Sequence, residues 1–196
     1  MEGKLLNKKK QKYSRLYDAA YDLFLSKGVH NTIIDDIVKD AGVAKGTFYL
    51  YFRDKYDLAD QIIIRKTSVL LNQALDALEE KKKSEPQNFQ QCVIFIADYL
   101  MCYFAQNKKF LEFTYKNLSL NLYEKIMNCT EMSTARQMFI RDFIAAGEKE
   151  ETAHMRLYIL ISLVSSVCYN SVILGIPFQF EMLKTELHHS IEKILT

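Results

Sequence analysis

The stretch AGVAKGTFYLYF, Ala41–Phe52, decides which fold this sequence specifies. It starts with small and polar residues and ends with aromatic ones, so it is too polar for a core helix and too aromatic for a loop. Phe48 and Phe52 are four residues apart, which puts them on one face of a helix, and they should turn inward. The stretch therefore predicts a short helix with a buried aromatic face and an exposed polar start.

The residues before this stretch predict another short helix. Thr32 suits a helix N-cap, with Asp35 three residues later in place of the usual glutamate of a capping box, and Gly42 suits the stop. Helices over 32–41 and 44–51, joined by a glycine turn, have the layout of a helix-turn-helix. Such a unit sets its second helix into the major groove of DNA. The sequence thus predicts a DNA-binding domain.

The composition of the second helix fits that role. Gly46 leaves out a side chain that would hold the helix backbone away from DNA. Lys45 and Thr47 bring hydrogen-bond donors to the N-terminal end of the helix, which itself favours phosphate. Tyr49 and Tyr51 can lay their rings on the edge of the duplex and donate their hydroxyls to phosphate oxygens.

At these residues the chain resembles a known family. The resemblance is to the DNA-binding domain of the TetR (tetracycline-repressor-like) family of bacterial regulators, and it covers LYDAAYDLFLSKGVHNTIIDDIVKDAGVAKGTFYLYFRDKYDL, Leu16–Leu58. Members of this family are all-α homodimers. Their C-terminal domain dimerises and usually holds a ligand cavity, so the resemblance implies both properties for the rest of this chain.

The resemblance also implies which residues contact DNA. Phosphate contacts are expected from Thr32, Lys45, Tyr49, Tyr51 and Lys55, and base contacts from the start of the second helix. Ala44 stands where many members have a serine that caps this helix, and the loss of that cap costs about 1 kcal/mol. The full set expected at DNA is Thr32, Ala44, Lys45, Gly46, Thr47, Tyr49, Tyr51 and Lys55.

The whole chain is expected to be all-α, with about nine helices. Its 196 residues include only two prolines and six glycines, which leaves few breaks between helices. The helical pattern first appears over 8–27. We expect a helix-turn-helix domain over 1–54 and a helical ligand-binding and dimerisation domain over 55–196.

Basic residues gather at the N-terminus. Residues 1–16 hold six of them against Glu2 alone, although the net charge of the whole chain is only +2. Such an arm favours a polyanion partner, and a solvated, frayed leader is the alternative. The competing function is a helical interaction protein of the same fold whose basic arm binds a membrane or another polyanion. Salt-dependent binding to one specific duplex separates the two functions.

Motifs of enzymes are missing from the sequence. It has no G-x-S-x-G, Walker loop, G-x-G-x-x-G or H-E-x-x-H motif, so we expect neither an enzyme nor a cofactor. His188 and His189 are adjacent, but such histidines are more often exposed than metal-bound, and no metal site is expected. The four cysteines form no C-x-x-C, which favours reduced core thiols in the cytoplasm. The N-terminus lacks the apolar region of a signal peptide.

No charged residue occurs over 157–180, a length that can span a bilayer. Several polar residues interrupt this segment, so we expect a buried helix and no membrane partner. Ser162, Ser166 and Asn170 form a row on one face, and small residues let two helices approach closely. We expect two copies of the chain to meet along this row, and the alternative is that it faces a ligand cavity. The expected interface residues are Ser162, Ser166, Asn170, Leu183, Leu187 and Ile191.

Aromatic residues are frequent in the C-terminal half, and most belong in a core. A helical core has little use for so many tyrosine hydroxyls, so some should line an apolar cavity with polar tips. The candidates are Tyr99, Tyr103, Phe139, Phe143 and Tyr158. Together these features predict a cytoplasmic repressor whose homodimer binds a palindromic DNA operator and is released by a small, largely apolar or aromatic ligand.

Overall fold

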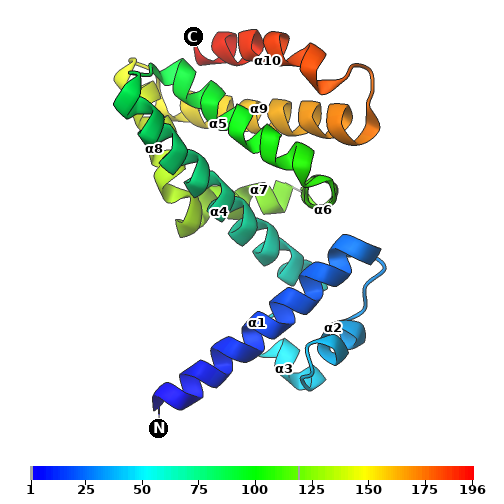
Figure 1. Ribbon diagram of the computed structural model, residues 1–196. Coiled ribbons are helices and arrows are strands. Elements are labelled where there is room, and N and C mark those ends of the chain that lie inside the picture. The colour runs from blue at the N-terminus through cyan, green and yellow to red at the C-terminus, as the bar shows by residue number, and fades with distance from the viewer. Residues whose placement is uncertain (1, 119) are drawn as a thin grey trace. The chain divides into compact units, whose positions relative to one another are not determined.

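The computed structural model is built from α-helices (Figure 1), as the sequence predicts. It describes residues 2–118 and 120–196, with the side chains of residues 6–118 and 122–196. Within these residues there are ten α-helices, a 3-10 turn and a π turn. The chain divides into two compact units, Met1–Lys66 and Thr67–Thr196, which are described separately. This division falls inside the fourth helix, whereas the sequence suggested a border at the start of that helix.

The N-terminal unit holds the helix-turn-helix. Its elements are α1 (Glu2–Lys27), α2 (Ile34–Asp40), α3 (Lys45–Tyr49) and the first turns of α4 (Lys55–Ser84). Phe48 and Phe52 are 0% and 2% exposed, which confirms the inward aromatic face predicted from their spacing. Helix α1 begins at Glu2, ahead of the expected start at Lys8, so the basic leader is helical rather than frayed.

Tyr17 joins α1 to α4 in the core of this unit. Its hydroxyl donates to the carbonyl oxygen of Ile62 at 3.4 Å, and the guanidinium of Arg65 lies over its ring. Burial raises the pKa of Tyr17 to about 12, so the phenol stays neutral and keeps its proton for this bond. This contact and the apolar core fix α1 against the start of α4.

The C-terminal unit is a helical bundle. Its remaining elements are α5 (Phe89–Gln106), α6 (Lys108–Lys116), α7 (Leu120–Asn128), the 3-10 turn Thr130–Met132, α8 (Ser133–Ala145), α9 (Glu150–Tyr169), the π turn Asn170–Leu174 and α10 (Phe180–Leu195). Helices α5, α9 and α10 pack against one another (Figure 1). Asp98 on α5 accepts a 2.8 Å hydrogen bond from Nε2 of His188 and pairs with Lys184 at 3.3 Å, which ties α10 to α5.

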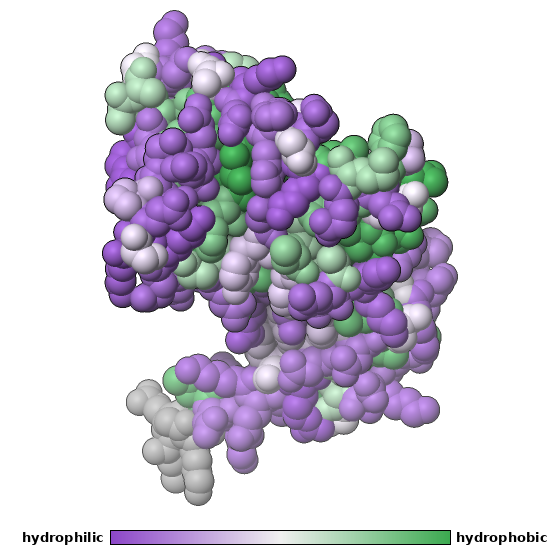
Figure 2. Space-filling model, turned by 45° about the horizontal axis from the view of Figure 1, so that its top comes forward, coloured by the Kyte–Doolittle hydropathy of each residue, from purple (hydrophilic) through white to green (hydrophobic). Residues whose placement is uncertain are grey.

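The long helix formed by α9 and the π turn is covered by its own chain on one side only. It runs over Glu150–Leu174. Leu160 and Cys168 are buried, and most of its other apolar side chains are half-buried against the core of the chain. By length and composition it could cross a membrane. The burial expected for this helix is therefore found on its inner side and not on its outer side, where Ile159 is exposed. Figure 2 shows hydrophobic surface over the end of α9 and the loop after it, where Leu174, Ile176 and Phe178 are exposed.

Candidate nucleic-acid interface

The turn between α2 and α3 is fixed by a glycine. Gly42 has φ +59°, a left-handed conformation that suits glycine. A Cβ atom at this position would lie 2.5 Å from Nη2 of Arg15, and the same Nη2 donates to the carbonyl oxygen of Gly42 at 3.2 Å. Any side chain here would displace Arg15. The turn that directs α3 is thus supported from α1.

The start of α3 carries a glycine that the fold itself does not require. A Cβ atom built on Gly46 would have no other atom within 4 Å. Glycine inside a helix is less stable than alanine by roughly 0.5–1 kcal/mol. Ala44, the N-cap of α3, has extended backbone angles and makes no side-chain cap hydrogen bond. The N-terminal end of α3 therefore presents bare backbone to its surroundings.

Lys45 is exposed and forms an ion pair with α2. Its Nζ atom lies 2.8 Å from Oδ1 of Asp35, and both side chains are more than half exposed. This hydrogen bond to a carboxylate raises the pKa of Lys45, so the amine carries its positive charge at neutral pH. Exposed ion pairs are weak and readily exchanged. A phosphate can therefore replace Asp35 as the partner of Lys45.

The residues at and just after the end of α3 differ in their exposure and in their hydrogen-bond partners. Tyr49 is 54% exposed and Leu50 is 79% exposed, whereas Tyr51 donates its hydroxyl to the carbonyl oxygen of Lys9 at 3.1 Å. Leu50 was not among the expected DNA contacts. The exposure of Leu50 could have been predicted, because Leu50 lies midway between Phe48 and Phe52 and so points away from the face that they share.

Thr32 does not cap α2, so this prediction was wrong. The N-cap residue is Ile33, and it makes no side-chain cap hydrogen bond. Thr32 is fully buried, its hydroxyl donates back to the carbonyl oxygen of Gly28 at 2.8 Å, and its amide donates to that of Val29 at 3.3 Å. Both donors are used inside the chain. Thr32 therefore shapes the turn before α2 and is left out of the contact set that we propose below.

Lys55 also serves this turn. Its Nζ atom donates to the carbonyl oxygens of His30 at 2.6 Å and Thr32 at 2.8 Å. An ammonium group has three donors, so one is left for a phosphate. Lys55 links the start of α4 to the turn before α2, in addition to any contact with DNA.

The five aromatic residues expected around a ligand differ in burial and in aromatic partners. Phe139 and Phe143 are buried in the core, where both pack against Phe89 with ring centroids 5.5 and 5.3 Å away. Tyr158 is exposed and lies edge-on to Tyr123. Tyr99 and Tyr103 are half-buried on α5. That these five residues line one ligand cavity stays a prediction.

An open cleft of about 490 Å³ lies between α8 and the start of α9. Its lining consists of Arg136, Gln137, Ile140, Arg141, Ile144, Glu150 and His154. His154 lies 3.8 Å from the carboxylate of Glu150. Within the described residues, no three His, Cys, Asp or Glu side chains are grouped as a metal site requires.

The row Ser162, Ser166 and Asn170 lies on the outer side of α9. Leu160 and Cys168 are buried, while Met155 and Ile159, in line with the row at helical spacing, are exposed. Within the row, Nδ2 of Asn170 donates to Oγ of Ser166 at 3.3 Å. The row therefore faces away from the core of its own chain.

Two residues expected beside this row lie elsewhere. Leu187 and Ile191 on α10 are 4% and 0% exposed and belong to the core cluster of the chain itself. They are not available to a second copy, so the interface prediction was wrong for them. Leu183 is half-buried at the start of the same helix.

Comparison with known proteins agrees with a helix-turn-helix domain at the N-terminus. The model of the family "Bacterial regulatory proteins, tetR family" matches residues 16–62. The fatty acid metabolism regulator protein of Bacillus subtilis is 33% identical over 76 residues, which are 39% of each chain. YvdT, an uncharacterised helix-turn-helix regulator of the same organism, is 30% identical over 110 residues, 56% of this chain and 54% of that protein. The matched regions thus span about half or less of these curated relatives.

Similarity of fold extends over nearly the whole chain. The crystal structure of the regulator FadR from Bacillus subtilis, in complex with stearoyl-CoA, superposes with a TM-score of 0.63. That superposition covers 91% of this chain and 97% of the other, at 19% sequence identity. At this identity the superposition demonstrates a shared fold. The match over residues 16–62, together with the helix-turn-helix geometry, identifies this region as a DNA-binding domain of the TetR type, and the superposition shows that the rest of the chain has the fold of such a regulator.

Proposed function

We propose that this chain is a cytoplasmic transcriptional repressor that binds a palindromic DNA operator as a homodimer and leaves it when a small apolar ligand binds. The TetR family consists of regulators and not of enzymes. The observation that carries the proposal is the surface around α3. Lys45, Tyr49 and Leu50 are exposed there. They lie beside Gly46, a glycine that the packing of the chain itself does not require. A groove of DNA explains both features, because it needs donors and close approach of the helix backbone.

An experiment on Lys45 and its partner tests the DNA contact. The probe is a duplex of about 30 base pairs, roughly three helical turns, that the protein selects from a random-sequence pool. Lys45→Ala should weaken binding and lower the slope of log affinity against log salt by about one, because one counterion release is lost. Asp35→Asn should strengthen binding, because it leaves the ammonium group without its competing carboxylate.

Gel-shift titrations at several salt concentrations measure both variants, and circular dichroism checks that their helical content is unchanged. Asp35 and Lys45 lie on opposite sides of one ion pair. A general loss of structure would weaken both variants, whereas a phosphate contact moves them in opposite directions. If neither variant changes the affinity, α3 is not the DNA-binding element.

The uncovered face of α9 supports the homodimer. This face has exposed Met155 and Ile159 in line with the row Ser162, Ser166 and Asn170. A second copy of the same helix can lie close along such a row of small residues and remove the apolar side chains from water. A homodimer also suits DNA, because two linked heads bind far more tightly than one.

The ligand is proposed to have a largely apolar part that the protein recognises. Stearoyl-CoA, which joins an apolar acyl chain to polar coenzyme A, is the first probe because a regulator of similar fold was crystallised with it. Added to the complex of protein and selected duplex, it should lower DNA affinity by about 5- to 150-fold, the usual range of coupling between two sites. Coenzyme A without an acyl chain is the control and should leave the complex intact. Equal release by both compounds would show that the acyl chain is not what is recognised.

A further inference from the structure

The N-terminal turns of α1 are a charged surface that the recognition helix does not include. Lys8, Lys9, Lys10 and Lys12 are all exposed. They lie on a continuous helix, in turns that extend beyond the pair α2 and α3 (Figure 1). A lysine on a helix has a fixed position, whereas a lysine on a flexible leader does not. Helical periodicity therefore gives the side of α1 on which each lysine lies.

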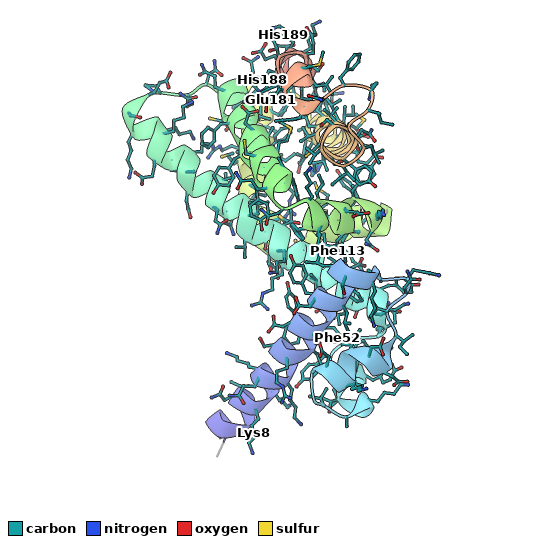
Figure 3. All side chains as sticks on the ribbon, turned by 45° about the vertical axis from the view of Figure 1, so that its right-hand side comes forward. Lys8, Phe52, Phe113, Glu181, His188 and His189 are labelled. Carbon is teal, nitrogen blue, oxygen red and sulfur yellow. The ribbon has the colours of Figure 1, made fainter. Side chains whose placement is uncertain are left out.

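Arg15 shows which way part of this surface faces. Lys8, Lys12 and Arg15 are spaced i, i+4 and i+7, so they form one row along α1. The guanidinium of Arg15 donates to the carbonyl oxygen of Gly42 in the turn between α2 and α3. The row therefore runs along the side of α1 that borders this turn, and it covers about 10 Å of helix. Figure 3 shows Lys8 at the far end of the row, away from the core at Phe52.

Tyr51 ties these turns to the chain that follows α3. Its hydroxyl donates to the carbonyl oxygen of Lys9 at 3.1 Å, and its ring meets that of Tyr13 edge-on with centroids 5.8 Å apart. Tyr13 in turn donates its hydroxyl to Gln61 on α4 at 3.2 Å. A phenol has one proton to donate. While Tyr51 binds Lys9, it cannot donate to a phosphate.

We propose that Lys8 and Lys12 of this row form a second DNA-contact surface, which binds the phosphate backbone just outside the base pairs met by α3. Tyr51 is the residue that positions this surface. The inference rests on the proposed DNA-binding function. It assigns Tyr51 a role different from the phosphate contact expected from the sequence. The hydroxyl acts through the helix that it holds.

DNA suits this surface better than a membrane does. The row leads through Arg15 to the turn before α3, so its charges continue the surface that carries Lys45. A helix that lies in a membrane interface needs a broad apolar face. From residue 6 to residue 15, within the part of the chain whose side chains are described, the only exposed large apolar side chain is Leu6.

The test is a double-mutant cycle on the selected duplex. The variant Lys8→Gln/Lys12→Gln should lower the salt slope by about two, since two counterion releases are lost. Tyr51→Phe keeps the ring and should weaken binding by about fivefold, the value of one hydrogen bond. In the Lys8→Gln/Lys12→Gln background, Tyr51→Phe should have no further effect, because the two charges that it positions are already gone.

A matched control removes two charges elsewhere. Lys108→Gln/Lys109→Gln changes two exposed lysines of α6 in the other unit and should leave the salt slope as in the wild type. Duplexes shortened to the base pairs met by α3 should bind the wild type and the Lys8→Gln/Lys12→Gln variant alike, because the flanking phosphates are gone. Equal binding on the short duplex and unequal binding on the long one locates the contact outside the half-site.

Several results would overturn the inference. An unchanged salt slope in Lys8→Gln/Lys12→Gln would remove the row from the interface. Additive effects in the cycle would show that Tyr51 donates to phosphate itself. Binding to vesicles of phosphatidylglycerol and phosphatidylcholine that depends on the two lysines, with DNA binding unaffected, would assign the row to a membrane. Failure of the proposed function looks different, because the wild type would then select no duplex at all.

Discussion

Ser166→Arg is expected to abolish the dimer and, with it, binding to the operator, although no residue at the DNA surface is changed. Ser166 lies in the middle of the outward row of α9, where its hydroxyl accepts a hydrogen bond from Asn170. In a close helix pair, each copy would bury an unpaired guanidinium. Burial of an uncompensated charge costs about 3–5 kcal/mol, which raises the dimer dissociation constant by more than about 100-fold.

Light scattering and gel-shift titration measure the two effects together. A monomer, or an aggregate, with operator affinity lowered by about 100-fold or more is expected, because a single head loses the gain from linkage. Ser166→Ala is the matched control and should remain a dimer, since it adds neither charge nor volume. A variant that stays a tight dimer but no longer responds to ligand would show that the row faces a cavity. Wild-type protein that needs detergent would assign the uncovered helix to a membrane.

Periodicity in the sequence was enough to predict the fold and the inner face of the helix-turn-helix. The spacing of Phe48 and Phe52 fixes which side of α3 is buried, because helical geometry leaves no other choice for two aromatic residues four apart. Gly42 is similarly informative, since a left-handed turn leaves few alternatives to glycine. Local geometry determines both features.

The partners of polar side chains could not be predicted in this way. Thr32 has the sequence context of a cap, but a threonine hydroxyl can equally donate to a carbonyl four residues back, as it does to Gly28. Tyr51 has the context of a DNA contact, yet its hydroxyl bonds Lys9, 42 residues away in the sequence. Such choices depend on where distant backbone groups lie.

Amphipathic pattern identifies a buried face but not what buries it. Leu187 and Ile191 were assigned to a second copy of the chain, and they lie in the core of their own. The apolar part of α9 was expected to be buried, and its outer side, with Ile159, is exposed on its own chain. In both cases the amphipathic pattern indicates which side of the helix has to be removed from water. Only the fold distinguishes a neighbour in the same chain from a partner outside it.

Gly46→Leu is expected to have opposite effects on folding and on DNA binding. A Cβ atom at this position meets nothing within 4 Å, so the larger side chain fits without a clash near the backbone. Leucine is also a better helix former than glycine, and the folded state should gain up to about 1 kcal/mol. On DNA, the same side chain would stand between the start of α3 and the groove. The loss of two contacts there lowers affinity by about 100-fold.

Thermal unfolding and gel-shift titration of Gly46→Leu and Gly46→Ala separate this explanation from others. Alanine should stabilise the fold in the same way, with a smaller loss of affinity because it projects less far. A purely structural role for Gly46 predicts that stability and affinity fall together, which the open space around its α-carbon argues against. Wild-type affinity in Gly46→Leu would mean that α3 does not approach the groove by its N-terminal end. A more stable protein that no longer binds its duplex would show that this glycine is present for DNA and not for the fold.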